Sequence, residues 1–164
     1  MLKRVNLYVA TTIRGVRPEE GTMLVIPEAI YEIDGKDTNY PQTAKVQRTR
    51  ASMHDAQLET LIFALKSLKK PKSRTWDVIL YTTESDEEVK ANKSAWLWTV
   101  TQIEQNLKKW ALNGWKTAAG KDVGDLWKEL YDLLQDFPIA FRVCADHPYR
   151  KWILENLKGD ENDT

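Results

Sequence analysis

Residues 110–121, WALNGWKTAAGK, combine two tryptophans with a lysine-rich loop. Trp110 and Trp115 are five residues apart, and Gly114 directly precedes the second ring. Four lysines flank or follow the rings: Lys108, Lys109, Lys116 and Lys121. Rings beside ammonium groups are typical of a surface that holds phosphates, but a ring can also close a core under a solvated loop. We expect Trp110 to close the core, whereas Trp115 is open to both interpretations.

The composition of the chain limits what this stretch can do. A length of 164 residues is enough for one domain with a substantial core, which we expect over 1–158, followed by a disordered polar tail over 159–164. The 24 lysines and arginines balance 24 aspartates and glutamates, so the formal net charge is zero. Any affinity for a polyanion must therefore come from a local patch.

Cysteine content and apolar patterning predict the compartment. A single cysteine, Cys144, excludes an intramolecular disulfide and a cysteine-rich zinc site, and it favours a reducing cytoplasm. No apolar run approaches the ~18 residues that a membrane span needs. The start MLKRVNLYVATT lacks the apolar core of a signal peptide. We therefore expect a cytoplasmic protein with no membrane partner.

The first third of the chain has the two-residue period of β-strands. VNLYVA (5–10) alternates apolar side chains between two faces. TMLVIPEAIYEI (22–33) predicts a second strand, in which Pro27 favours an edge position or a bulge. A third strand is predicted over 40–49, after the turn DGKDTN. Together they predict an antiparallel meander.

From residue 54 the apolar period becomes that of helices. HDAQLETLIFALKSLKK (54–70) predicts a helix that ends before Pro71, followed by a buried strand over 76–82 parallel to the first. The remaining predicted elements are helices over 95–112 and 122–135, a strand over 138–145 and a helix over 147–157. The order β-β-β-α-β-α-α-β-α predicts an α/β fold: a mixed five-stranded sheet, three strands antiparallel and two parallel, flanked by helices.

WALNGWKTAAGK, with DLWKEL (125–130) and IAFRVCADH (139–147), resembles the second half of ribonuclease H type 1. In that family the pattern W-x-x-x-G-W-K-T forms a basic protrusion between two helices. The predicted element order is also that family's fold, and QLETLIFALKSL (57–68) matches its first helix. The resemblance therefore implies a ribonuclease H-like fold over nearly the whole chain.

The resemblance also implies a metal site that this chain does not keep. Family members cleave the RNA strand of an RNA/DNA hybrid with two Mg²⁺ ions, which are held by four carboxylates. Two adjacent hard cations need that density of anionic oxygen. The matching positions are Ala10, Gln57, Thr83 and Leu154. Because all four ligands are missing, the resemblance favours a protein that is not a nuclease and needs no cofactor.

Two features could still preserve chemistry at this centre. His147 matches a mobile histidine of the family, but a surface position or a cap on the helix that begins at Pro148 is the simpler interpretation. A rearranged Mg²⁺ site could use Glu84 and Asp146, with Glu155 as a further candidate ligand. Asp55 and Glu59 are two residues from Gln57 on a helix, ~200° around it, so we expect both to face away.

The resemblance assigns nucleic-acid binding to the protrusion. Its candidate binding residues in this chain are Lys108, Lys109, Trp115, Lys116, Thr117 and Lys121. The family also holds the RNA strand through polar residues before the first helix, where this chain has Ser52, Met53 and His54. We therefore expect the protrusion to be retained and that second contact to be altered.

One segment, over about 84–100, is longer than is typical of the family. It contains ESDEEVKANKSAWLW (84–98), which is acidic and then aromatic. Trp96 and Trp98 are ~200° apart on a helix, so they cannot share one buried face. We therefore expect one of the two rings to lie outside that face. It either is exposed and contacts a protein partner, or packs against the chain's own extended helix.

Three functional hypotheses follow. The leading one is a catalytically inactive ribonuclease H-like domain, a pseudoenzyme that binds an RNA/DNA hybrid or structured RNA through the protrusion. The second is a protein-interaction or scaffold module that uses the 84–100 segment. The third is an active ribonuclease H with the rearranged Mg²⁺ site. Fold analogy alone would place such a domain beside a reverse transcriptase or another mobile-element protein.

Overall fold

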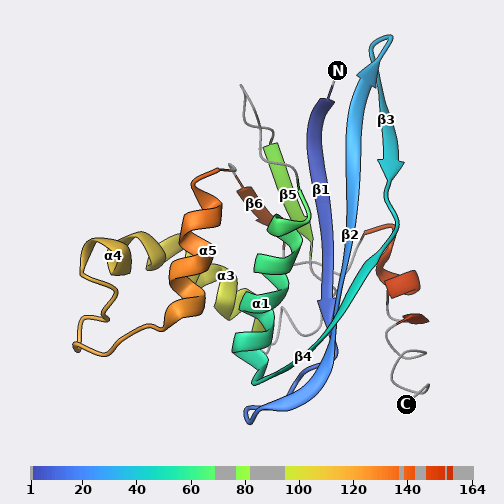
Figure 1. Cartoon of the computed structure of the whole chain (residues 1–164). Helices are drawn as coiled ribbons and strands as arrows, with labels where there is room; N and C mark the ends of the chain where they lie inside the picture. Colours follow the sequence, from blue (N-terminus) through green and yellow to red (C-terminus); the bar gives the residue numbers. More distant parts are fainter. Residues whose placement is uncertain are drawn as a thin grey trace.

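The described residues form one mixed β-sheet with helical segments on both sides (Figure 1). The computed structural model describes residues 2–68, 77–81, 95–136, 139–142, 147–153 and 155–156. Six strands make up the sheet within these residues: β1 (Leu2–Thr11), β2 (Glu19–Ile33), β3 (Lys36–Pro41), β4 (Lys45–Ala51), β5 (Asp77–Tyr81) and β6 (Ile139–Arg142). The predicted tail over 159–164 lies outside the described residues.

The strand order is β3-β2-β1-β5-β6, and β4 also pairs with β2. β1 is antiparallel to β2 and parallel to β5, which is in turn parallel to β6. α1 lies between β4 and β5 in the chain, so the parallel β1–β5 pair is closed by a connection that contains this helix. The prediction of an α/β fold with a mixed sheet is confirmed.

The prediction of a single strand over 40–49, and hence of five strands, is wrong. β3 pairs with the second half of β2, over Glu28–Ile33, and β4 pairs with the first half, over Glu19–Val25. The break between them lies opposite Pro27, whose carbonyl accepts the N–H of Gln42 at 2.8 Å. Proline has no N–H to donate on that side, so the ladder is interrupted there.

Of the two alternatives predicted for Pro27, an edge position or a bulge, the structure excludes the edge position. β2 lies between β1 and the β3/β4 strands, and Pro27 stands opposite Leu7 of β1. In an antiparallel strand the N–H and C=O of one residue point to the same side. The irregularity that proline causes is consequently carried by the neighbouring strand, not by β2.

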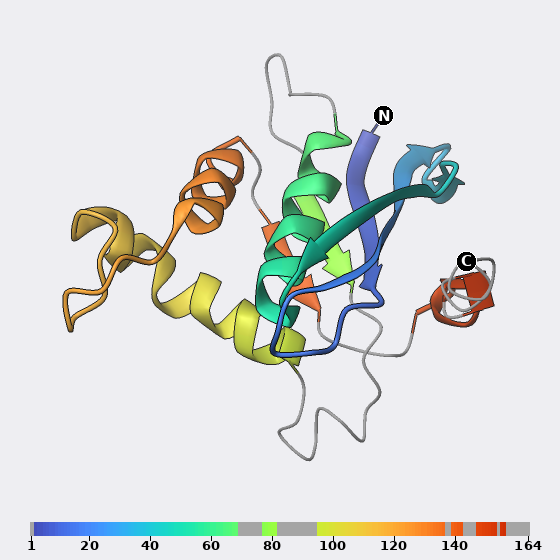
Figure 2. The ribbon, with the colours of Figure 1, turned by 60° about the horizontal axis from the view of Figure 1, so that its bottom comes forward.

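The structure describes four helices with defined ends: α1 (Met53–Lys66), α3 (Ala95–Gln105), α4 (Leu107–Leu112) and α5 (Asp125–Leu134). Residues 150–153 and 155–156 are also helical. α1 crosses one face of the sheet beside α5, and α3 leads away from α1 towards α4, whereas the C-terminal helical residues lie on the other side (Figures 1 and 2). In the described part of the chain, no helix is long and apolar enough to cross a membrane.

The helix predicted over 95–112 is divided at Asn106. Its φ of −119° departs from helical geometry, and its side-chain amide donates to Gln102 Oε1 at 2.7 Å. Asparagine competes with the helix by such local hydrogen bonds, so a break there is physically reasonable. The break separates the part of the segment that packs on α1 from the part that carries the lysines.

The two faces of β1 enter different clusters, as the alternation in VNLYVA predicts. Val5, Leu7 and Val9 pack in the main core with apolar residues of α1 and α5. Tyr8 and Ala10 face the other way and pack with residues that include Ile153 of the C-terminal helical segment. Each helical layer therefore covers one face of the same central strand.

The main core is completed by the helices. Leu58, Leu61 and Leu65 of α1 are almost fully buried, as their spacing predicts. Leu130 and Trp127 of α5 are also buried. Burial of leucine and tryptophan side chains contributes roughly 25 cal/mol per Å² of apolar area. This core fixes α5, and thus one base of the protrusion.

Candidate nucleic-acid interface

Residues 107–124, which we call the protrusion, extend from α4 to the start of α5 and stand away from the sheet (Figures 1 and 2). Trp110 anchors its base: its ring meets that of Trp127 at 5.2 Å between centroids, in an edge-to-face arrangement at 74°. Such pairs are favourable because the ring edge and face carry opposite partial charge. The core role predicted for Trp110 agrees with this contact.

Trp115 turns the chain at the end of α4. Gly114 and Trp115 both have φ of 65°, which is a left-handed conformation. The N–H of Trp115 donates to the carbonyl of Trp110 at 2.8 Å, and its ring stands edge-on to Tyr131 of α5 at 5.3 Å. Trp115 is only partly buried, so the ring joins the two arms of the protrusion and keeps some exposed surface.

The rest of the loop is a short, closed structure. Lys116 and Asp122 form an antiparallel bridge, and the N–H of Thr117 donates to the carbonyl of Lys121 at 2.8 Å. The N–H of Lys121 in turn donates to Thr117 Oγ1 at 3.2 Å. Thr117 is therefore used to hold the loop. The bridge places Lys116 and Lys121 at the two ends of the same small loop.

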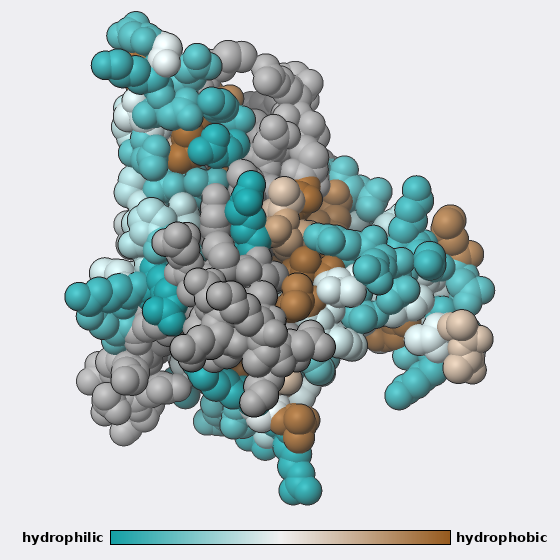
Figure 3. Space-filling model, turned by 180° about the vertical axis from the view of Figure 1, so that it is seen from behind, coloured by the Kyte–Doolittle hydropathy of each residue, from teal (hydrophilic) through white to brown (hydrophobic). Residues whose placement is uncertain are grey.

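The lysines of the protrusion give it its charge. Lys108, Lys109, Lys116 and Lys121 are all exposed. Among the residues that the structure describes, none of the four forms an ion pair. Seen from behind, the protrusion presents mainly hydrophilic side chains around a few apolar ones (Figure 3). On a chain of zero net charge, it is a local cationic patch on a braced support.

Two of the four positions that the resemblance gives to metal ligands can be located. Ala10 is fully buried on the face of β1 that the C-terminal segment covers. Gln57 is buried on α1, and its Oε1 accepts a hydrogen bond from Thr99 Oγ1 of α3 at 2.5 Å. Ala10 thus packs in an apolar cluster with Ile153, whereas Gln57 is hydrogen-bonded to α3. Thr83 and Leu154 lie outside the described residues.

Ala10 and Gln57 do not fit a pair of Mg²⁺ ions. A methyl group offers no ligand atom, and a neutral amide offers one uncharged oxygen, which Thr99 already uses. Among the described residues, no three His, Cys, Asp or Glu side chains are grouped so as to hold a metal. Glu84 and Asp146, the acids of the rearranged-site hypothesis, lie outside the described residues.

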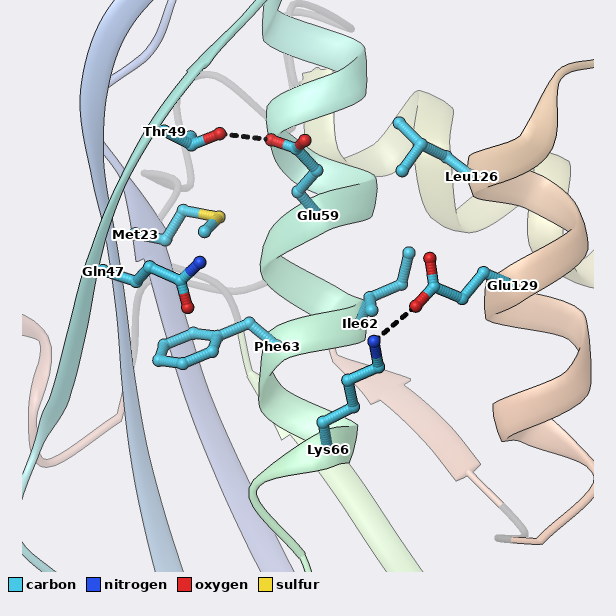
Figure 4. A pocket seen from close by; sticks show the side chains of 9 residues that line it. All are labelled: Met23, Gln47, Thr49, Glu59, Ile62, Phe63, Lys66, Leu126 and Glu129. Atoms are coloured by element: carbon cyan, nitrogen blue, oxygen red, sulfur yellow. Dashed lines mark hydrogen bonds and ion pairs between the residues drawn. The ribbon is translucent and has the colours of Figure 1, made fainter.

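The acids beside Gln57 face away from it, as helical rotation predicts. Asp55 is exposed, and Glu59 Oε2 accepts a hydrogen bond from Thr49 Oγ1 of β4 at 2.7 Å. Glu59 lines a cleft of about 250 Å³ between β4, α1 and α5 (Figure 4). Across this cleft Lys66 pairs with Glu129 of α5. Asp55 thus points to solvent and Glu59 to β4, so neither acid adds charge beside Gln57.

His147 lies on the opposite face of the sheet from α1. Its ring is 4.9 Å from that of Tyr8, and its Nδ1 accepts the backbone N–H of Tyr149 at 3.2 Å. This hydrogen bond agrees with the helix-capping interpretation, because the His147 side chain accepts a backbone N–H at the start of the C-terminal helical segment. A catalytic role for His147 stays a prediction.

Sequence reasoning missed a buried carboxylate beside this histidine. Glu28 of β2 is 1% exposed. Its Oε1 accepts hydrogen bonds from Asn6 Nδ2 and Tyr8 OH, both at 3.0 Å, and its Oε2 accepts one from Tyr149 OH at 2.5 Å. A glutamate inside the apolar run TMLVIPEAI was the available signal. The network ties the C-terminal segment to β1 and β2.

Tyr149 shows the electrostatic effect of this network. Partial burial, followed by the hydrogen bond and the negative charge of Glu28, raises the pKa of the Tyr149 hydroxyl to about 12. All these effects disfavour the tyrosinate. Tyr149 is therefore a neutral donor to Glu28 over the physiological range.

Comparison with solved structures identifies the class of fold. LC9-RNase H1, a type 1 RNase H with the type 2 active-site motif, matches with a TM-score of 0.64 at 16% identity, over 97% of this chain and 74% of that one. LC11-RNase H1, solved in complex with an RNA/DNA hybrid, matches with a TM-score of 0.52 at 14% identity, over 94% and 93%. The fold is thus ribonuclease H-like.

Sequence comparison identifies the family within that class. A ribonuclease H of Chlorobium luteolum is 30% identical to this chain over 157 residues, which cover 91% of this chain and 89% of the relative. No protein-family model matches the chain. At this identity and coverage, the chain belongs to the ribonuclease H family, as the motif around Trp110 and Trp115 predicts.

Proposed function

We propose that this protein is a ribonuclease H-type domain that binds an RNA/DNA hybrid, or structured RNA of similar shape, without cleaving it. The observation that carries the binding is the braced protrusion with its four exposed lysines. Ammonium groups on a rigid support neutralise phosphates and release counterions. The family relationship and the hybrid bound by LC11-RNase H1 support a hybrid as the ligand.

The loss of cleavage is proposed from the residues at the metal-ligand positions. Ala10 and Gln57 cannot supply charged oxygens, and the amide of Gln57 is engaged with Thr99. Two Mg²⁺ ions that lose several of their carboxylates repel one another and leave the site. No cofactor is therefore expected. A rearranged site built on Glu84 and Asp146 is the alternative that this proposal rejects.

The binding proposal is tested by salt-dependent affinity. Titration of a labelled hybrid at two salt concentrations gives the slope of the logarithm of affinity against the logarithm of salt concentration. The magnitude of this slope should decrease by about 0.7–0.9 when Lys116→Ala removes one phosphate contact. Lys3→Ala is the matched control, because Lys3 is an exposed lysine of β1 paired with Asp37. Equal slopes for Lys116→Ala and the unaltered protein would exclude the protrusion as the phosphate contact.

A scaffold function makes a different prediction for the same titration. A protein that acts only through protein contacts would show no salt-dependent affinity for hybrid, duplex RNA or single strands. The burial of Trp96, 4% exposed, removes one of the two rings that this alternative would use. Trp98, 46% exposed, is the ring that stays accessible.

A further inference from the structure

Trp98 lies at the start of α3, where it meets the start of α1. Its ring contacts that of His54 with 4.2 Å between centroids and 39° between ring planes. Trp98 is 46% exposed, whereas Trp96, two residues earlier, is 4% exposed in the main core. The sequence predicts that one of the two rings is exposed, and the structure identifies it as Trp98.

The position of Trp98 is fixed on both sides along the helix. Trp96 packs in the core before it, and Thr99, directly after it, donates to Gln57 of α1 at 2.5 Å. A large ring that is held in place loses little further freedom on binding, so its apolar surface is available at low entropic cost. The exposed part of Trp98 is consequently a preorganised surface.

His54 provides the second ring of the pair. It belongs to the segment before and into α1, where the resemblance places contacts to an RNA strand. Its Nδ1 is buried and, among the described residues, has no hydrogen-bond partner. The pair therefore presents an aromatic surface with a polar ring at its edge, at the end of α1 that also carries Gln57.

The surface beyond Trp98 leads to the cationic protrusion. One ridge of the helical segment 95–112 is formed by residues spaced four, three and four apart: Trp98, Gln102, Gln105 and Lys109. The bend at Asn106 interrupts this ridge between Gln105 and Lys109. Lys109 is eleven residues from Trp98, about 17 Å at most by helical rise. Figure 2 shows α3 running from α1 to the protrusion.

We propose that the Trp98–His54 pair is a stacking platform for an unpaired nucleobase, on a strand whose phosphates lie on the lysines of the protrusion. This inference rests on the proposed function and names its substrate class: a hybrid or RNA duplex with a single-stranded extension. Base–aromatic stacking tolerates any sequence, because every base has a π-face. A strand with ~3.4 Å per nucleotide spans the distance from Trp98 to Lys109 in about five nucleotides.

The test compares two labelled hybrids that differ only by a five-nucleotide single-stranded RNA extension. The unaltered protein should bind the extended hybrid roughly ten-fold more tightly than the blunt one, which corresponds to stacking of one base. Trp98→Ala should abolish this preference without changing the salt dependence of blunt-hybrid binding. Trp98→Phe should keep most of it, and His54→Ala should weaken it.

Trp152→Ala is the matched control. Trp152 is 44% exposed in the C-terminal helical segment, on the other side of the sheet, so its loss should leave the preference unchanged. Thermal melting checks that each variant is folded, and Trp98→Phe keeps the test valid if Trp98→Ala does not fold.

Two failures can be distinguished. Blunt-hybrid binding that depends on salt, together with a Trp98→Ala variant that still prefers the extension, would overturn the stacking platform and leave the proposed function standing. Absence of binding to either hybrid would overturn the proposed function and this inference with it.

Discussion

Gln57 has a structural role at the position where the resemblance expects a metal-binding glutamate. Its side chain is 2% exposed and joins α1 to Thr99 of α3, which is itself fully buried. A neutral amide and a hydroxyl can be buried together because each satisfies the other. A carboxylate buried there without metal ions would be costly, whereas the neutral amide can be buried at this position without them.

Replacing the donor of this hydrogen bond should destabilise the fold. Thr99→Val keeps the shape of the side chain but leaves Gln57 Oε1 buried without its partner, which costs about 1–3 kcal/mol. Urea unfolding measures the loss. Thr101→Val, at a partly exposed position on the same helix, should change stability by much less. Equal stability of both variants would show that the α1–α3 hydrogen bond contributes nothing.

Tyr149 gives a second prediction, for alkaline pH. The pKa of its hydroxyl is about 12 in the folded protein, against about 10 for an unperturbed tyrosine. Folding therefore favours the neutral form, and this stabilisation is complete below about pH 10 and is lost as the pH rises towards 12. The unfolding free energy of the unaltered protein should fall more steeply over this window than that of Tyr149→Phe.

Tyr149→Phe also removes the hydrogen bond to Glu28, which lowers stability at neutral pH as well. The quantity to compare is therefore the slope of the unfolding free energy with pH, not its absolute value. Tyr40→Phe is the control: Tyr40 is 48% exposed and should leave the slope as in the unaltered protein. Parallel curves for the unaltered protein and Tyr149→Phe would contradict the raised pKa of the Tyr149 hydroxyl, whose causes are burial first and then Glu28.

Among the elements, the turn at Gly114 and Trp115 determines how the lysines are presented. Gly114→Ala places a Cβ on a residue with φ of 65°, which costs about 1–2 kcal/mol for an L-residue. We expect a lower unfolding midpoint and weaker hybrid binding, because the turn positions the loop that follows. Calorimetry and the hybrid titration measure both effects.

Gly15→Ala is the matched control for that variant. Gly15 has no positive φ, and an added Cβ there would meet Glu19 only at an ordinary 3.5 Å. It should therefore change neither stability nor affinity to a comparable extent. If Gly114→Ala binds hybrid as tightly as Gly15→Ala, the conformation of the turn does not govern the phosphate contacts.

The elements that the sequence predicts well are those with one clear apolar period. α1 and β1 are of this kind: α1 buries its leucines at helical spacing, and β1 alternates its side chains between two buried clusters. The break between β3 and β4 was not predictable in this way, because it depends on Pro27 in a neighbouring strand. Helix α3 ends at Gln105 through a local hydrogen bond of Asn106, which an apolar pattern does not reveal.

The candidate site was predictable only in part. The lysine loop and the missing ligands at Ala10 and Gln57 can be read from the chain, because they depend on residue identity at motif positions. The contacts Thr99–Gln57 and Trp98–His54 could not be, since they join segments more than forty residues apart. They depend on how α3 packs against α1, which is a tertiary property.

At the scale of the whole molecule, the chain combines a net charge of zero with a cationic protrusion. A protein without a net field attracts nucleic acid only where its charge is concentrated, so orientation and affinity should both be set by the protrusion. The sheet and its two helical layers serve as the support. At the other face, Glu28 and Tyr149 attach the C-terminal segment by buried hydrogen bonds.

This family member is proposed to bind an RNA/DNA hybrid without cleaving its RNA strand. This is tested by incubating a labelled RNA/DNA hybrid with the protein, at a concentration that saturates binding, in the presence of Mg²⁺ or Mn²⁺. Both hybrid binding and the length of the RNA strand are measured. We predict that the hybrid is bound and that its RNA strand stays intact. Cleavage of the RNA strand that disappears in Glu84→Gln or Asp146→Asn would contradict the claim and establish a rearranged metal site.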